Sequence, residues 1–495
     1  MIREFNVEDS LKAYLRKSKE VKQVFHQDKK VIPLLPFSTK FDDPIERNIK
    51  EDFKSFDGCI GHCYREIMCK ALPKQLAGSK EQTNFKKNLK ESILENAALI
   101  TNCEEGQKEK LKSIIESVFF REDNLVKYGN SAQLYLFWNY QQPGLKNIAD
   151  FIRELFFDED LDKLVAETKD QKKNVFHELI DRSLPLLDEV SSIKGKSDKP
   201  FHVLDQGIIE RFRSDFRFLL KMDKGTFLVE SEKLLKFYYF AYVSKAAFMF
   251  GDFFTKKEHQ LYFTLESESV SESRRTNESG WKMLETRIWK FFSHTVALDF
   301  INHIPLVSET GTMDYIQLSE LYKSSAKDQQ EELIAHAKLI CDTYLKYAPK
   351  DVDWLIFEDY FNARIKIADP KNEFEEIIYR LYCQIDFQFE KSSRKSKRNS
   401  YGKWFIVFSK EYILKNRGRS GYSLSLTNET LLFITKLCIA GQEKMRLKDL
   451  WRQFNERGIY FDDSTQQAIV EIYDKINLIE KKSDSGDAQY IRPIL

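Results

Sequence analysis

Apolar residues recur every three or four positions along most of the 495-residue chain, which is the spacing of amphipathic helices. We therefore expect a mainly α protein with a few short β-strands. The most apolar run, Phe237 to Phe254, is interrupted by Lys245 and Asp252, so it predicts a buried helix and not a membrane span. The aromatic and β-branched composition of residues 260–265 predicts a short strand instead.

Polar connections divide this pattern into segments. A chain of this length is too long for one ordinary core, and a polar stretch at residues 191–200 breaks the helical pattern. Further along, Trp404–Phe408 and Tyr422–Leu426 each predict a strand within a basic segment. The predicted division is an N-terminal helical domain at 1–190, a central helical domain with one short strand region at 201–390, the basic segment at 391–426, and a last domain at 427–495.

Residues 427–495 carry the most specific pattern in the chain. A first helix opens at Asn428 and stops at Gly441, and a second ends at Gly458. A third is capped by Asp463 or Ser464. Two short strands, 478–482 and 488–492, complete the order. Three short helices followed by a hairpin predict a winged helix-turn-helix, in which the third helix or the wing commonly meets DNA.

The charge of this last domain leaves its partner open. It contains ten basic and eleven acidic residues, whereas a domain that neutralises phosphates is usually strongly basic. Asp463, Glu471 and Asp474 put negative charge on the third helix itself. Both DNA binding and docking onto another protein are therefore compatible with the sequence.

A strong charge excess lies just before this domain. Residues 391–420 contain ten basic residues and one acidic residue, Glu411. This segment could follow a phosphate backbone, and the alternatives are a solvated linker or contact with an acidic partner. Basic residues of the predicted hairpin could contact phosphates too, although exposed lysines also protect edge strands. The candidate nucleic-acid-binding residues are Lys391, Arg394, Lys395, Lys397, Arg398, Lys403, Arg417, Arg419, Lys481, Lys482 and Arg492.

Composition limits the class of protein further. The formal net charge is +1, so any nucleic-acid surface must be local. Seven scattered cysteines, and a charged N-terminus without a secretory signal, predict a reducing, cytoplasmic location.

Nucleotide hydrolysis and nuclease chemistry have weak support. Gly195-Lys196-Ser197 resembles the end of a phosphate-binding loop, but Val190 stands where the first glycine of that loop is needed. Carboxylates cluster at Phe156–Asp160 and at Asp351 and Asp353, where the helix dipole favours acids in any case. We expect no enzyme activity, but a metal-dependent nuclease built from distant carboxylates stays open.

One group of residues resembles the beginning of a metal site. Cys59, His62, Cys63 and Cys69 lie close together, but their spacing is not that of structural zinc ligands. Cys59 and Cys63 are one helical turn apart, as two buried core residues would be. The sequence therefore predicts a structural role and no bound metal or cofactor.

Three stretches resemble one known family. They are Arg446 through Gly458 to Lys482–Tyr490, the strand Leu261–Leu265, and Ser273–Arg275 ahead of Gly280–Lys282. These stretches resemble DptG, a component of bacterial phosphorothioation-dependent DNA restriction systems, mainly over the middle and the C-terminal third of the chain.

The resemblance implies a non-catalytic subunit that contacts double-stranded DNA and serves as a scaffold in antiviral defence. Its partners would be an ATPase and a helicase-like subunit, and its target would be DNA that lacks the sulfur modification. A protein–protein adaptor without DNA binding of its own is the alternative, together with the unrecognised nuclease.

Overall fold

The computed structural model describes residues 3–10, 15–16, 24–25, 33–73, 82–121, 123–168, 174–190, 200–269, 275–348, 351–481 and 489–494. The chain is 66% helix and 6% strand, which confirms the predicted mainly α class with a few short strands. No helix among the described residues is both long enough and apolar enough to cross a membrane.

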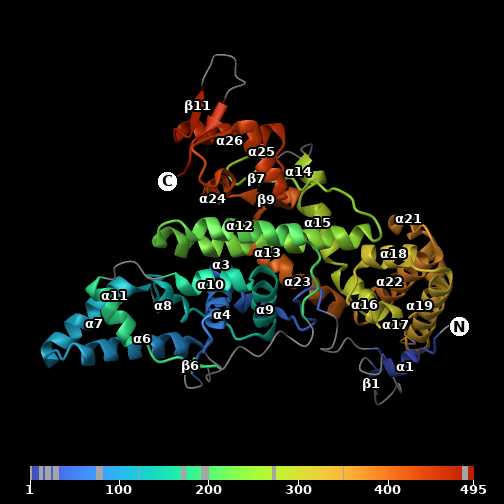
Figure 1. Ribbon diagram of the computed structural model, residues 1–495, viewed down its shortest axis with the longest axis horizontal. Helices are drawn as coiled ribbons and strands as arrows, with labels where there is room; N and C mark the ends of the chain where they lie inside the picture. Colours follow the sequence, from blue (N-terminus) through green and yellow to red (C-terminus); the bar gives the residue numbers. More distant parts are fainter. Residues whose placement is uncertain are drawn as a thin grey trace.

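The longest helix, α13 (Lys224–Asp252), lies across the middle of the molecule beside α12 (Gln206–Leu220) (Figure 1). It has 29 residues and is therefore about 43 Å long. Apolar side chains cover all of its sides, and Phe237, Tyr239 and Val243 are almost fully buried. The buried helix predicted over Phe237–Phe254 is confirmed, and it ends at Asp252.

The N-terminal helices lie on one side of α13, below it in Figure 1. One of their contacts shows how they join the rest of the chain: a Cβ on Gly144 would come within 2.3 Å of the Trp404 ring, so only glycine allows this approach. These helices are α1 (Val7–Ser10), α2 (Asp43–Asn48), α3 (Lys50–Ser55), α4 (Asp57–Ile67), α6 (Gln82–Ile100), α7 (Glu105–Phe119), α8 (Asn130–Gln133), α9 (Pro143–Phe156), α10 (Glu159–Glu167) and α11 (Val175–Ser183).

Most of the helices that follow α13 gather around its C-terminal end, at the right of Figure 1, whereas α14 (Arg275–Glu278) lies above α13. Every residue of α16 (Phe291–Ile301) is buried, and so are most residues of α22 (Glu373–Lys391). Helices of this kind form the interior of a large protein. The helices of this part of the chain are α14 (Arg275–Glu278), α15 (Trp281–Ile288), α16 (Phe291–Ile301), α17 (Pro305–Ser308), α18 (Tyr315–Ser324), α19 (Lys327–Tyr347), the 3-10 helix η2 (Trp354–Ile356), α20 (Phe357–Asn362), α21 (Ile365–Ala368) and α22 (Glu373–Lys391).

The basic segment is mostly one helix. Helix α23 (Lys395–Tyr412) contains Trp404–Phe408, so the predicted strand there is wrong. These five apolar residues are buried among helices, and a short apolar run does not distinguish a buried strand from a buried helix. The segment contains two strands all the same. The predicted strand Tyr422–Leu426 is confirmed as β9, and the other strand, β8 (Leu414–Asn416), was not predicted.

Strand β9 joins the basic segment to the middle of the chain. It lies between β8, which is antiparallel to it, and β7 (Thr264–Leu265), which is parallel. The strand observed here covers two residues of the predicted range 260–265. Within the same range, Tyr262 forms an isolated β-bridge with Tyr460. A 3-10 helix, η3 (Gly418–Ser420), connects β8 to β9.

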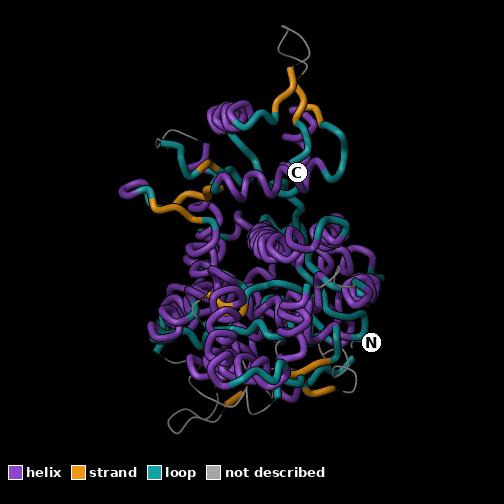
Figure 2. Tube along the Cα trace, turned by 90° about the vertical axis from the view of Figure 1, so that its left-hand side faces the viewer, coloured by secondary structure: helices purple, strands orange, loops and turns teal. Residues whose placement is uncertain are grey.

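The C-terminal residues contain the three predicted helices and the predicted hairpin, which stand above the helical body in Figures 1 and 2. The third helix is capped by Asp462, one residue before the predicted position. The first helix is followed by two residues in the left-handed region, Ala440 with a φ of 43° and Gly441. The elements are α24 (Asn428–Ile439), β10 (Met445–Arg446), α25 (Leu447–Glu456), α26 (Asp463–Lys475), β11 (Ile479–Lys481) and β12 (Gln489–Ile491). Strand β10 was not predicted, and it completes an antiparallel sheet in the order β10-β12-β11.

One core joins the predicted segments. A continuous cluster of buried apolar residues extends from Phe5 to Ile491 and includes residues of all four. A second, smaller core lies between α6, α7 and α11. The remaining described strands form two-residue pairs: β1 (Leu15–Arg16) with β2 (Val24–Phe25), β3 (Lys70–Ala71) with β6 (Asp188–Glu189), and β4 (Phe120–Arg121) with β5 (Asn124–Leu125).

Candidate nucleic-acid interface

The C-terminal residues 427–494, called the C-terminal unit below, are anchored to α12 by a buried ion pair. Arg457 Nη2 lies 2.8 Å from Asp215 Oδ1, and Arg457 Nε lies 3.1 Å from Asp215 Oδ2. Both side chains are at most 5% exposed, and Tyr238 donates a further hydrogen bond to Asp215. Such a paired geometry holds two planar groups in one orientation. The C-terminal unit therefore has a defined position on the helical body.

Arg417, one of the predicted DNA contacts, has a structural position. Its guanidinium donates hydrogen bonds to the hydroxyls of Ser423 and Ser425, at 2.9 and 3.0 Å, and to the carbonyl oxygens of Leu265 and Glu268. Ser423 and Ser425 belong to β9, the middle strand of the sheet, and Leu265 belongs to β7, so Arg417 links β9 to β7. Its donors are largely occupied within the protein.

Arg398, another predicted contact, is buried between α22 and α23. Arg398 Nη1 lies 2.9 Å from Asp386 Oδ1, and Nη2 lies 2.5 Å from Glu390 Oε2. Asp386 also accepts Lys290 Nζ at 2.6 Å and the Tyr360 hydroxyl at 2.7 Å. Burial would raise the pKa of Asp386, but Lys290 and Arg398 outweigh burial and hold that pKa below its usual range. Arg398 is therefore not part of the accessible basic surface.

Three other predicted residues of this segment also have intramolecular partners. Arg394 lies over the Phe389 ring at 4.6 Å, and burial lowers its pKa. Lys395 Nζ lies 2.9 Å from Glu390, and Lys403 Nζ lies 4.0 Å from Glu46. The Lys395 side chain is about half exposed, so its pair with Glu390 is a surface pair that an incoming phosphate can replace.

The accessible cations of the basic segment form two separate groups. Lys391, Lys395 and Lys397 are exposed at the turn between α22 and α23, whereas Lys410, near the end of α23, and Arg419, in η3, are exposed at the other end of the segment. Helix α23 separates the two groups, and its 18 residues are about 27 Å long. The excess of charge that is continuous in the sequence is therefore not one continuous surface.

A different basic group lies on the terminal sheet. Its solvent-facing side, called the outer sheet face below, carries Lys444, Arg446, Glu480, Tyr490 and Arg492. The strand register pairs Arg446 with Tyr490 and Tyr490 with Glu480, so these three side chains form one row across the sheet. Lys444 Nζ lies 5.3 Å from the centre of the Tyr490 ring. Glu480 lies 3.3 Å from Lys444 and 3.6 Å from Arg492.

The sequence reasoning missed two residues of this face, Lys444 and Arg446. They flank Met445, which is buried on the opposite side of β10. Alternation of exposed and buried residues is the signal of a strand, but three residues are too short for it to be recognised. Of the predicted hairpin contacts, Arg492 is exposed on this face, whereas the Lys481 side chain and all of Lys482 lie outside the described residues.

The exposed side of α26 has the opposite charge. Asp463, Glu471 and Asp474 are all exposed, in agreement with the acidic third helix expected from the sequence. Phosphate groups are repelled by such a surface. If the C-terminal unit contacts DNA, the outer sheet face is thus better suited to that contact than α26.

The cysteine and carboxylate candidates have structural positions. Cys59 and Cys63 are buried and free, and burial raises the pKa of Cys59 well above its usual value. Asp158 caps α10 and Asp353 caps η2, each by accepting a backbone N–H. The Gly195-Lys196-Ser197 stretch lies outside the described residues, as do Ser273, Arg274 and residues 482–488 of the resemblance.

No protein-family model matches the chain, and no curated protein matches it either. The likeness to DptG therefore stays a prediction from the residues that carry it. The function is therefore inferred from the exposed cations of the basic segment, from the outer sheet face and from the order of elements in the C-terminal unit.

Proposed function

We propose that the chain is a non-catalytic, DNA-contacting and scaffolding subunit, and that its C-terminal unit is a winged helix. The observation that carries the proposal is the order α24, β10, α25, α26, β11, β12, combined with a three-stranded antiparallel sheet whose outer face is basic. A helix, a short strand, two helices and a hairpin, in this order, is the arrangement of winged-helix domains.

The outer sheet face supplies the chemistry for backbone contact. Lys444 and Arg446 lie beside the Tyr490 ring, and Arg492 pairs with Glu480, so the described part of this face carries three cations against one carboxylate. Lysine and arginine contacts to phosphates position a protein on a duplex without reading its sequence. We therefore propose binding to duplex DNA of any sequence, with an affinity that depends strongly on salt.

The scaffolding part of the proposal has a structural basis in the anchor. The Arg457–Asp215 pair fixes the outer sheet face relative to α12 and the helical body. A rigid connection of this kind holds the outer sheet face at a fixed distance and orientation from the helical body, whereas a flexible tether would let both vary. The resemblance to DptG supports an assembly with an ATPase and a helicase-like subunit that acts on DNA without phosphorothioate groups.

A binding experiment tests the DNA contact. Fluorescence anisotropy of the full chain on unmodified and phosphorothioated duplexes is compared for the wild type and for the variant Lys444→Glu with Arg446→Glu. A matched control, Lys448→Glu with Arg452→Glu, makes the same change of charge on exposed residues of α25. We expect binding by the wild type and the control and at least a tenfold loss in the outer-sheet variant; equal affinities for all three proteins would refute the proposed contact.

One observation favours the alternative, a protein adaptor. The exposed side of α26 is acidic, and Ile476 just beyond its end is 45% exposed. An acidic surface beside an apolar residue suits a basic protein partner. Stoichiometric complex formation with the partner subunits, in the absence of duplex binding, would favour the adaptor.

A further inference from the structure

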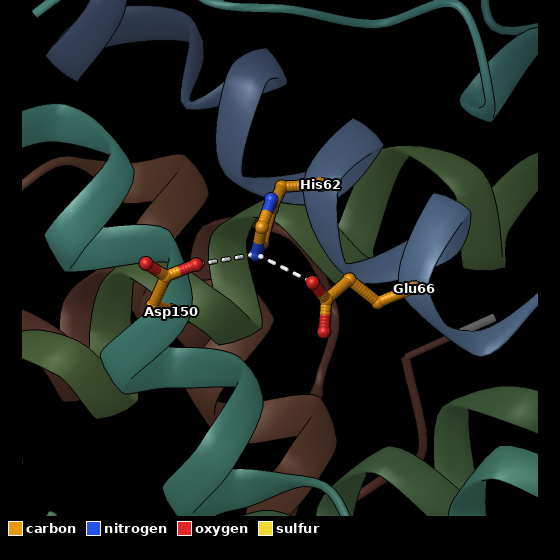
Figure 3. A group of neighbouring side chains, drawn as sticks. All are labelled: His62, Glu66 and Asp150. Atoms are coloured by element: carbon orange, nitrogen blue, oxygen red, sulfur yellow. Dashed lines mark ion pairs between the residues drawn. The ribbon is translucent and has the colours of Figure 1, made fainter. Parts of the chain in front are cut away.

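Three side chains with metal-binding atoms converge between α4 and α9, far from the outer sheet face in sequence. His62 and Glu66 lie one turn apart on α4, and Asp150 points toward them from α9 (Figure 3). His62 Nε2 lies 2.9 Å from Asp150 Oδ1 and 3.6 Å from Glu66 Oε1. One ligand atom from each of the three residues lies within 4.8 Å of the others.

These separations are close to those of ligands around one ion. Ligands that lie about 2.1 Å from a tetrahedral Zn²⁺ are about 3.4 Å from each other. The observed 2.9 and 3.6 Å fall on either side of this value. Small rotations of the three side chains would therefore allow all of them to contact one ion, without movement of either helix.

The histidine nitrogen faces both carboxylates. The Nε2 atom of His62 is excluded from solvent, and its neighbours are the Asp150 carboxylate at 2.9 Å and the Glu66 carboxylate at 3.6 Å. An ion at this position would accept the lone pair of a neutral imidazole and contact both carboxylates.

The charges around the histidine also favour a cation. Lys146 Nζ lies 2.6 Å from Asp150 and neutralises one of the two carboxylates. Glu66 forms no ion pair with a lysine or arginine within the described ranges, and it lies 3.6 Å from His62 Nε2. With a neutral imidazole, the group of four side chains keeps one excess negative charge. The Glu66 and Asp150 side chains are 29% and 33% exposed, so an ion has access from solvent.

We propose that His62, Glu66 and Asp150 form a binding site for one divalent transition-metal ion of the Zn²⁺ type. One imidazole nitrogen and two carboxylate oxygens are a ligand set that such ions accept, and water would complete the coordination. The ion would connect α4 to α9 and stabilise the N-terminal helices. The cysteines of α4 take no part, because Cys59 and Cys63 are buried in the core.

The test uses the full chain after removal of metal with a chelator. Isothermal titration with Zn²⁺ is combined with elemental analysis, and the absorption spectrum of the Co²⁺-loaded protein reports the coordination number. We expect one equivalent of bound metal and a higher melting temperature. Glu66→Gln and Asp150→Asn should each weaken binding at least tenfold, because each removes a ligand charge and keeps the side-chain shape.

A matched control separates this site from an ordinary ion pair. His259 Nε2 lies 2.7 Å from Asp252 Oδ2 in a well-aligned hydrogen bond, and this pair is not part of a three-residue ligand group among the described residues. The variant His259→Asn should bind metal as the wild type does. The proposal is overturned if the wild type takes up no stoichiometric Zn²⁺ or Co²⁺. It is equally overturned if Glu66→Gln, confirmed as folded by circular dichroism, binds with wild-type affinity.

Discussion

The anchor between Arg457 and Asp215 allows a prediction with a definite magnitude. Replacing Arg457 with Ala leaves the Asp215 carboxylate 5% exposed and without its cation, while the Tyr238 hydroxyl still donates a hydrogen bond to it. Removing one partner of a buried pair costs about 3–5 kcal/mol, because the other charge stays buried without compensation. We expect a loss of this size in the free energy that keeps the C-terminal unit closed on α12.

Hydrogen exchange measures this quantity locally, which matters because a chain of 495 residues need not unfold in two states. The amides of α24 and α25 should exchange faster in Arg457→Ala, and those of α16 should not. The variant Arg457→Met with Asp215→Leu removes both charges and should recover much of the protection.

A surface pair serves as the control for this experiment. Arg452 is 67% exposed and pairs with Asp449 and Glu456 on its own helix, so Arg452→Ala should change the same free energy by less than about 1 kcal/mol. If Arg457→Ala costs no more than Arg452→Ala, the buried pair is not the anchor, and the reasoning is refuted.

Two further predictions concern buried charges. Burial raises the pKa of Asp52 to about 7, so the folded chain keeps a proton that the unfolded chain releases near pH 4. The contribution of Asp52 to the free energy of unfolding should therefore fall as the pH rises from about 4 to about 7 and stay constant above that. Chemical denaturation at a series of pH values measures this fall. If Asp52→Asn shows the same fall as the wild type, the raised pKa of Asp52 is not its cause. Arg398→Gln should lower stability by about 3–5 kcal/mol because it leaves Asp386 with one fewer cation, whereas Lys397→Gln, one residue away and exposed, should change it by less than about 0.5 kcal/mol. Equal melting temperatures for these two variants would show that the Arg398 pair is not structural.

Periodicity and end signals made part of this fold predictable. Helix α13 is apolar on all sides over many residues, and the helices of the C-terminal unit have both an apolar stripe and terminal glycines or caps. The strand predicted at Trp404–Phe408 is wrong because five apolar residues fit either element when both sides are buried. The surrounding helices, which are distant in sequence, decide the outcome.

The candidate sites were less predictable than the helices. Arg398 belongs to a run of positive charge in the sequence. It is buried because α22 packs against α23 and brings Asp386 and Glu390 into contact with it. His62 has cysteines as its neighbours in the sequence, but its partner Asp150 lies on a different helix. Contacts between distant residues are set by packing, and no local pattern encodes them.

The most direct test of the central claim is the salt dependence of duplex binding by the wild type and by Lys444→Gln with Arg446→Gln. Each phosphate contact contributes about 0.9 to the slope of log K against log salt concentration. We expect binding by the wild type and, because both side chains neutralise phosphates, a slope about 1.8 units shallower in the variant. Identical slopes and affinities, or no duplex binding by the wild type at low salt, would contradict the proposed contact through the outer sheet face.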